Sequence, residues 1–322
     1  MQETATANRT RVLEFTLVGI GVVLIALVPW LGGNYAVRVA TTICMFVTMG
    51  LSWNFIGGYA GYPSFATAAF FGFGAYAGAI LQTKGVPMIV AWLAATVLTA
   101  AFSAALGFAI LRLRGHYFAV GSFAVLELVK LAASSWTGLT GGGTGLNVPI
   151  MPGGPEFVGR VFLFAMLGLA IVTFVAAVLV DGSRLGFGLR CIRQNESAAN
   201  MLGVDVNLLK IAAFVLSATF VGTSGAIYAS WVSYIDPAES FSILMTIKVP
   251  VMVMLGGAGT LLGPIVGVAT FQLLEEKIWS SFLDIHSGVL GLAIVLLVFL
   301  LPGGLLRLPA RLGWVRGAQA VP

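Results

Sequence analysis

The chain alternates between long apolar runs and short polar stretches. Each apolar run is close to the ~20 residues that a helix needs to cross the hydrocarbon core of a bilayer. Charged residues, prolines and glycines divide the runs into ten segments, at 13–31, 36–56, 64–82, 88–111, 117–135, 159–180, 208–231, 242–258, 260–281 and 286–302. The pattern predicts an all-α polytopic membrane protein with about ten transmembrane helices, within a range of about 8 to 11. The exact count depends on how 57–82 and 242–264 are divided.

Composition excludes the soluble classes of protein. Hydrophobic residues make up 59% of the chain and charged residues 9%, with a mean hydropathy of +1.00, whereas a soluble domain carries about 25% charged residues. The net charge of +5 comes from residues scattered between apolar runs, so we expect membrane lipid and no nucleic acid as a partner. Cys44 and Cys191 lie in an apolar run and a basic loop, which excludes a disulfide framework.

The distribution of positive charge predicts the orientation. Cytoplasmic loops of membrane proteins carry an excess of lysine and arginine. If the chain starts in the cytoplasm, alternating spans leave Arg38, Lys84 and Arg160 outside. The same alternation places ten arginines inside: Arg9, Arg11, Arg112, Arg114, Arg184, Arg190, Arg193, Arg307, Arg311 and Arg316. We therefore expect a cytoplasmic tail at 1–12, six spans over 13–180, a cytoplasmic loop at 181–207, four spans over 208–302 and a cytoplasmic tail at 303–322.

Two connecting loops are longer than the others. The outer loop, 136–158, is too rich in glycine and proline for a regular helix. The inner loop, 181–207, has helical spacing between 184 and 203 and predicts an amphipathic helix at the cytoplasmic surface. Its apolar stripe consists of Leu189, Ile192, Ala199 and Leu202, and its polar face of Arg190, Arg193, Gln194 and Glu196.

Enzyme chemistry finds little support in the sequence. The glycine-rich stretch 141–145 has no following Lys-Ser or Lys-Thr pair and lies in the outer loop, which argues against a phosphate-binding loop. His116 and His286 fall on opposite sides of the membrane, so they cannot form a metal or catalytic pair. We expect a protein that is not an enzyme and holds no metal or cofactor of its own.

Ionisable residues inside predicted spans are the candidates for function, because burying a charge in the membrane is costly. Glu127 and Lys130 are three residues apart in the fifth span, and they either neutralise each other or line a polar path. Lys248, in a segment broken by Pro250, either lines the same path or extends outward to the interface. Both alternatives remain open for each residue.

Glycines interrupt or pattern several spans. The stretches 57–61 and 256–259 break apolar runs on the same side of the membrane, and such breaks either form ordinary turns or expose backbone groups to a transported solute. Small residues also recur every four positions, which favours close helix packing. They are Gly74 and Gly78; Ala218, Gly222 and Ala226; and Gly259, Gly263 and Gly267.

Four sequence blocks carry a family resemblance. They are the blocks Gly61–Leu81, Leu111–Pro149, Ser183–Tyr228 and Val251–Leu306, the third being SRLGFGLRCIRQNESAANMLGVDVNLLKIAAFVLSATFVGTSGAIY. In order and spacing the blocks resemble permeases of the LivM type from branched-chain amino acid ABC transporters. The resemblance implies a homologous second permease of the LivH type, two ABC ATPase subunits that bind ATP and magnesium, and an external solute-binding protein.

The resemblance also implies roles for particular residues. The inner loop would couple the permease to an ATPase through Arg190, Arg193, Glu196, Ser197, Ala198, Ala199 and Gly203. Ser197 stands where the family motif has glutamate, with Glu196 displaced by one, and Thr67 stands where a histidine is usual. The candidate translocation path consists of Ser64, Thr67, Glu127, Lys248, Gly256 and Gly257.

Together these features predict an ATP-driven importer subunit in a bacterial inner membrane. It would move branched-chain amino acids or a related small solute by alternating access. Similar permeases serve urea, short amides and aromatic or other carboxylic acids, so these solutes are the first alternative. A secondary transporter or channel that needs no ATPase would show more acids within its spans. A structural or receptor-type membrane protein would lack an amphipathic inner helix.

Overall fold

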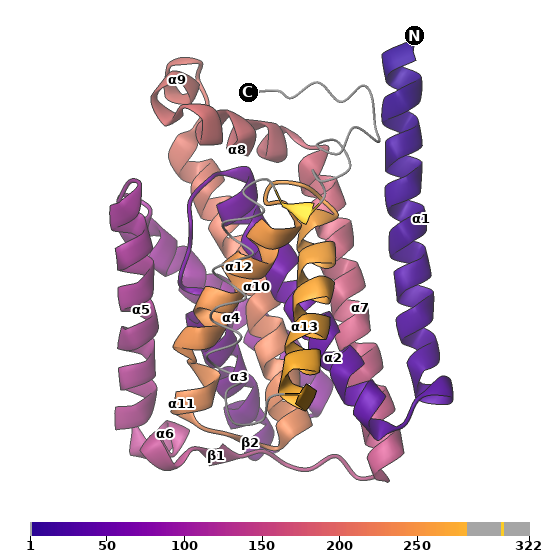
Figure 1. Ribbon diagram of the computed structural model, residues 1–322. Helices are drawn as coiled ribbons and strands as arrows, with labels where there is room; N and C mark the ends of the chain where they lie inside the picture. The colour runs from indigo at the N-terminus through magenta and orange to yellow at the C-terminus, as the bar shows by residue number, and fades with distance from the viewer. Residues whose placement is uncertain (1, 282–303, 306–322) are drawn as a thin grey trace.

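The computed structural model describes residues 2–281 and 304–305. The predicted segment 286–302, His286 and the three arginines beyond 305 lie outside the described residues. Within the described residues, nine long helical segments run up and down through the bundle (Figure 1). They are α1 (Gln2–Leu31), α2 (Asn34–Trp53) with its continuation η1 (Asn54–Tyr59), α3 (Thr67–Thr83), α4 (Met88–Ile110), α5 (His116–Ser135), α7 (Pro155–Asp181), α10 (Val206–Val232), α12 (Ile243–Gly256) and α13 (Gly263–Ser281).

Six of the described helical segments are long and apolar enough to cross a membrane. They are Asn34–Tyr59, Met88–Ile110, His116–Ser135, Pro155–Asp181, Val206–Val232 and Pro237–Gly256. Within α1 the apolar part, Phe15–Leu31, is shorter. The chain is therefore a helical multi-pass membrane protein, as predicted, and the total of about ten spans stays a prediction.

Short elements close the two ends of the bundle. At one end lie α8 (Arg184–Gln194) and α9 (Glu196–Met201), and at the other lie α6 (Thr137–Thr140), η2 (Gly142–Thr144), β1 (Leu146–Asn147), β2 (Tyr234–Ile235) and α11 (Pro237–Ser240) (Figure 1). The strands pair antiparallel, with Leu146 opposite Ile235. The all-α prediction missed this ribbon because two-residue strands leave no periodic signal; distant loops meet and satisfy each other's backbone groups.

Helices α3 and α10 pack closely through their small residues. A Cβ atom on Gly74 would lie 2.0 Å from the carbonyl oxygen of Gly222, and one on Gly78 would lie 2.9 Å from the Cβ of Ala226. The backbones can approach this closely only because glycine has no side chain. The predicted small-residue contacts are therefore confirmed for this helix pair.

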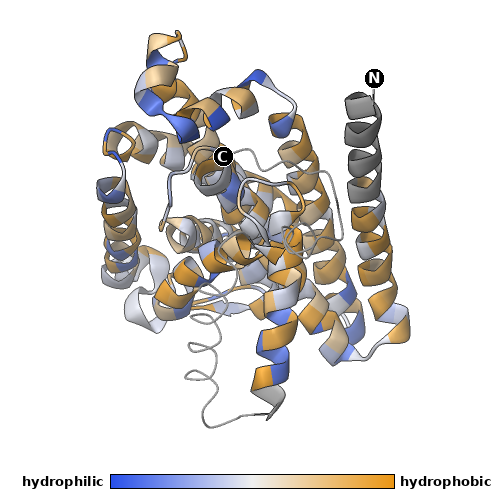
Figure 2. Cartoon of the chain, turned by 45° about the horizontal axis from the view of Figure 1, so that its top comes forward, coloured by the Kyte–Doolittle hydropathy of each residue, from blue (hydrophilic) through white to orange (hydrophobic). Residues whose placement is uncertain are grey.

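Burial differs sharply between the helices. The most apolar stretch of α2 and η1 is 83% buried, whereas those of α4 and α5 are 22% and 28% buried. Hydrophobic residues run along much of the length of the long helices (Figure 2). Helix α2 is thus the central element, and α4 and α5 present apolar surface to lipid or to another membrane subunit.

Candidate functional site

The inner loop forms two helices instead of the single predicted helix over 184–203. Asn195 is extended, with φ −159° and ψ 108°, and ends α8. Its side chain then caps α9, because its Oδ1 accepts a hydrogen bond of 3.0 Å from the backbone N–H of Ala198. Ser183 caps α8 in the same way through the N–H of Gly186. The prediction of one helix was wrong because an asparagine cap interrupts the helical hydrogen bonds.

The break divides the predicted apolar stripe. Leu189, Ile192 and Ala199 are buried against this chain, whereas Leu202 is 82% exposed. The prediction that all four share one stripe was therefore wrong, because the kink at Asn195 turns α9 relative to α8. The large apolar side chains that stay exposed on these two helices and just beyond them are Phe187, Met201 and Leu202.

Arg193 connects α8 to the end of the central helix. Its Nη1 donates a 2.7 Å hydrogen bond to the carbonyl oxygen of Gly58, within η1. Asn54, one turn earlier, bridges onward, accepting from the N–H of Gly259 at 2.8 Å and donating to the carbonyl oxygen of Thr260 at 2.9 Å. The α8 helix, η1 and the α12–α13 loop are thus joined through three hydrogen bonds.

The two predicted glycine breaks therefore meet in space, on the same side as expected. A Cβ on Gly57 would lie 2.3 Å from the ring of Trp53, and one on Gly58 would lie 1.8 Å from Asn54 Oδ1. The element η1 is a π-helix, a rare form that is found most often at functional sites. Here it opens the carbonyl of Gly58 to Arg193, and the chain then turns at Gly61, whose φ is +73°.

A second cluster joins α9 to the bundle. Glu196 accepts a hydrogen bond from the hydroxyl of Tyr62, and its Oε1 lies 3.1 Å from Nζ of Lys210 and 3.5 Å from Nε of Arg114. Lys210, on α10, is 1% exposed and also donates to the carbonyl oxygen of Leu111 at 3.4 Å. A buried lysine is retained only where paired and hydrogen-bonded.

The cluster shifts the acidity of its members. Burial acts to raise the pKa of Glu196, but the hydrogen bonds from Tyr62 and Lys210 and the charges of Lys210 and Arg114 prevail and lower it. Burial and the neighbouring Glu196 raise the pKa of Tyr62. Glu196 is therefore held as a carboxylate, with Tyr62 as its protonated donor.

The three charged members of the predicted coupling set all bond to this chain itself. Arg190 Nη1 lies 2.6 Å from Oδ1 of Asp181, at the end of α7. With Arg193 on Gly58 and Glu196 on Lys210, all three polar residues tie the two short helices to the bundle. Among the remaining members Ala199 is buried, whereas Ser197, Ala198 and Gly203 are exposed.

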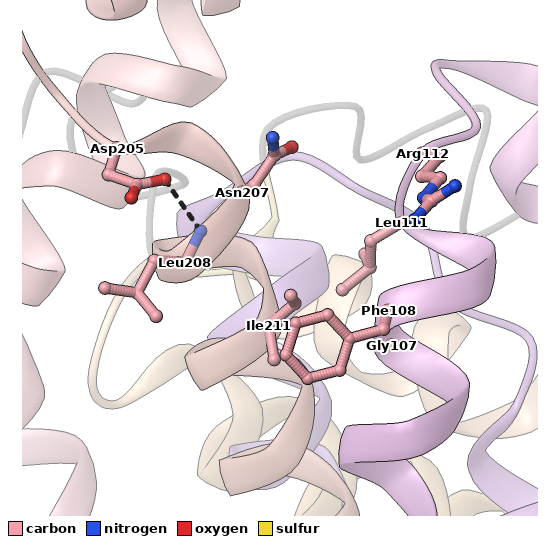
Figure 3. Close-up of a pocket in the computed structure, with 8 residues that line it drawn as sticks. All are labelled: Gly107, Phe108, Leu111, Arg112, Asp205, Asn207, Leu208 and Ile211. Carbon is pink, nitrogen blue, oxygen red and sulfur yellow. Dashed lines mark hydrogen bonds between the residues drawn. The ribbon is translucent and has the colours of Figure 1, made fainter.

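A cavity near this end lies apart from the hydrogen bonds that join α8, η1 and the α12–α13 loop. It has a volume of about 370 Å³ and opens between the end of α4 and the start of α10. Figure 3 shows Phe108 and Ile211 on its apolar side, Arg112 pointing away, and Asp205 capping α10 through the N–H of Leu208. The cavity is not lined by Arg193, Gly58, Asn54, Gly259 or Thr260, so it does not form part of the joined breaks.

The predicted path residues are not all brought together. Ser64 and Thr67 are buried where the non-helical segment meets α3, and the carbonyl of Ser64 accepts a 2.8 Å hydrogen bond from Trp53. Gly256 and Gly257 pack against the start of α13. These four residues fill the interior of this chain.

The intramembrane charges behave differently from each other. Glu127 is exposed on α5 and Lys130 is partly buried, and neither forms an ion pair with any residue that the structure describes. The alternative in which the two side chains neutralise each other is therefore wrong. Lys248 does not extend outward; it forms an ion pair with Glu275 of α13.

Sequence reasoning missed Asn54, Tyr62, Lys210 and Glu275. Lys210 and Glu275 stand inside predicted apolar segments, and the cost of an intramembrane charge was the signal that would have found them. Asn54 and Tyr62 border the first glycine break and carry no charge, so only the fold reveals their partners.

Comparisons with known proteins agree with this architecture. Residues 35–300 match the family model described as the permease component of branched-chain amino acid transport systems. The chain is 28% identical to the high-affinity branched-chain amino acid transport permease LivM of Salmonella typhimurium and to LivM of Escherichia coli, across 91% of this chain and 76% of each relative. It is 24% identical to Escherichia coli LivH across 56% of this chain and 62% of that protein. No solved structure matches. The match to the family model spans most of the sequence, and the chain belongs to the family of branched-chain amino acid transport permeases.

Proposed function

We propose that the chain is a transmembrane subunit of an ATP-driven importer that brings branched-chain amino acids into a bacterial cytoplasm across the inner membrane. The observation that carries the proposal is the linkage of α8 to both helix breaks, together with the ion pair that joins α9 to α10. A protein that binds α8 and α9 in the aqueous phase and moves them therefore also moves η1, the continuation of the central helix α2. The names of the relatives supply the solute class.

The end that carries α8 and α9 is the cytoplasmic end in this proposal. The exposed surface of Ser197, Ala198, Met201, Leu202 and Gly203 docks on an ATPase subunit. Arg190, Arg193 and Glu196 transmit its movement inward through their bonds to the bundle. Two ATPases bind ATP and magnesium, and their closure drives alternating access, while the N-terminal and C-terminal tails lie in the cytoplasm.

Helix α5 is the proposed contact with a second, LivH-like permease. It is largely uncovered by this chain and carries Glu127 on its exposed side. A carboxylate facing acyl chains is costly, whereas a wet path between two permeases accommodates it. Glu127 thus remains the path candidate, an external binding protein delivers solute at the end with α6 and α11, and Lys248 with Glu275 supports the adjacent wall.

The test is transport by the complex reconstituted with its ATPases and binding protein. We expect ATP-dependent uptake of labelled leucine. Met201→Ser with Leu202→Ser should leave the permease inserted and reduce ATPase co-purification and uptake about tenfold, since two large exposed apolar contacts are lost. Leu113→Ser, also at this end, is the matched control. Uptake of urea or an aromatic acid in place of leucine would overturn the proposed solute, and normal ATPase association by the double variant would overturn the docking surface.

A further inference from the structure

A cavity of about 320 Å³ lies between α2 and α13, toward the end opposite α8 and α9. It is lined by Tyr35, Arg38, Val39, Thr42, Gln272 and Glu276. The two helices pack side by side along this stretch (Figure 1). Its volume is near the lower end, about 300 Å³, of the range for small-molecule sites. Arg38 gives the α2 wall of the cavity a cation, and Glu276 gives the α13 wall a carboxylate.

The two charges do not neutralise each other. Neither Arg38 nor Glu276 has an ion-pair partner among the residues that the structure describes. At the same end, Arg160 and Glu156 do form an ion pair, with 3.8 Å between Nη2 and Oε2. Arg38 is exposed and Glu276 is partly buried, so both groups remain available to a molecule that carries the opposite charge.

Gln272 gives a second, independent indication of a ligand. Its side chain is 8% exposed and lines the cavity, yet its amide has no hydrogen-bond partner within the described part of the chain. Because this amide is not among the fully enclosed polar groups that lack a partner, it reaches the open space of the cavity, where it can bond to water or to a ligand. A polar ligand in the cavity would supply that partner.

We infer that this cavity binds a free α-amino acid as a zwitterion, with its carboxylate on Arg38 and its ammonium on Glu276. Gln272 serves either polar group, and Tyr35 and Val39 offer apolar surface to an aliphatic side chain. The inference rests on the proposed function and deepens it, because it places a solute site at the end where the solute would arrive. Recognition requires both charges of the ligand together, since each wall satisfies only one.

The test measures leucine binding to the assembled permease–ATPase complex, without ATP, in phosphatidylglycerol nanodiscs. The competitors are 4-methylpentanoate, which is leucine without its amino group, and 3-methylbutylamine, which is leucine without its carboxylate. Arg38→Gln should weaken leucine binding about tenfold and leave competition by 3-methylbutylamine unchanged. Glu276→Gln should weaken leucine about as much and leave competition by 4-methylpentanoate unchanged. Arg160→Gln is the matched control and should bind as the unaltered protein does.

A charge exchange guards against variants that fold poorly. Arg38→Glu alone should abolish binding, and Arg38→Glu combined with Glu276→Arg should restore it, because the zwitterion can turn around. Leucine binding that both single variants retain would overturn the inference while leaving the proposed transport standing. Leucine binding that vanishes when phosphatidylethanolamine replaces phosphatidylglycerol would assign the site to a lipid headgroup and would also overturn it. A complex that imports no leucine, yet binds it in a manner weakened by both variants, would overturn the proposed function and keep the site.

Discussion

The α8 end of the helix bundle and the α2–α13 cavity treat their polar groups in opposite ways. Beside α8 and α9, side chains from distant parts of the chain are bonded together, as Arg193 is to Gly58 and Glu196 to Lys210. Between α2 and α13 at the other end, Arg38 and Glu276 share a cavity without an ion-pair partner in the described residues. The first arrangement joins elements into one body, and the second leaves groups available to a ligand.

This difference follows from the cost of burying polar groups. A bonded charge in a protein interior fixes the geometry around it, because breaking the bond leaves an uncompensated charge. An unbonded polar group retains its capacity to bind something else. The contrast predicts that substitutions at the α8 end act on stability and coupling, whereas those in the α2–α13 cavity act on ligand affinity.

The largest effect is expected at Lys210. Lys210→Met should lower the free energy of unfolding by about 3 to 5 kcal/mol, because Glu196 loses its buried partner. The measurement is denaturant unfolding of the complex in nanodiscs. Lys84→Met, which alters an exposed lysine at the opposite end, is the control and should change stability by less than about 0.5 kcal/mol. Equal losses for the two lysines would contradict the contrast between the ends.

A smaller effect on folding and a clear one on coupling are expected at Arg193. Arg193→Ala removes the hydrogen bond to Gly58 and should reduce ATP-dependent uptake about tenfold. A tenfold change corresponds to about 1.4 kcal/mol, which is close to the free energy that a hydrogen bond to a charged group contributes. Uptake and ATP hydrolysis would be measured together, since uncoupling predicts hydrolysis that persists without transport. The control Arg184→Ala removes an exposed arginine from the first turn of the same helix. If both alanine variants transport equally, Arg193 does not transmit movement.

Much of the fold was predictable from hydrophobic periodicity. The expected spans 88–111 and 208–231 correspond to Met88–Ile110 and Val206–Val232, because an apolar stretch of membrane length must form a helix to satisfy its backbone. The repeated small residues likewise predicted close helix packing, which Gly74 and Gly222 form between α3 and α10. These features depend on neighbours along one helix, which a sequence displays directly.

The candidate site was predictable only in part. The glycine breaks and the inner loop were found from composition, but their connection through Arg193 joins residues 135 positions apart. Ala199 illustrates the limit, since helical spacing placed it on a stripe with Leu202 while the cap at Asn195 separates them. Which long-range partner a polar side chain selects depends on tertiary packing, and spacing along the chain does not record it.

The smallest expected effect is a pH dependence at Glu196. Its pKa is lower in the folded chain than the ordinary value of 4.5, so its stabilising contribution is present above that value and is lost as the pH falls through the folded pKa. Melting temperatures of the nanodisc complex between neutral pH and about pH 4 should fall less for Glu196→Gln than for the unaltered protein. Glu156→Gln, at the opposite end, removes a carboxylate whose side chain is 75% exposed and should leave the acid sensitivity unchanged. An equal reduction of the acid sensitivity by both variants would show that the α8 end holds its carboxylate no more firmly than the exposed first turn of α7 does.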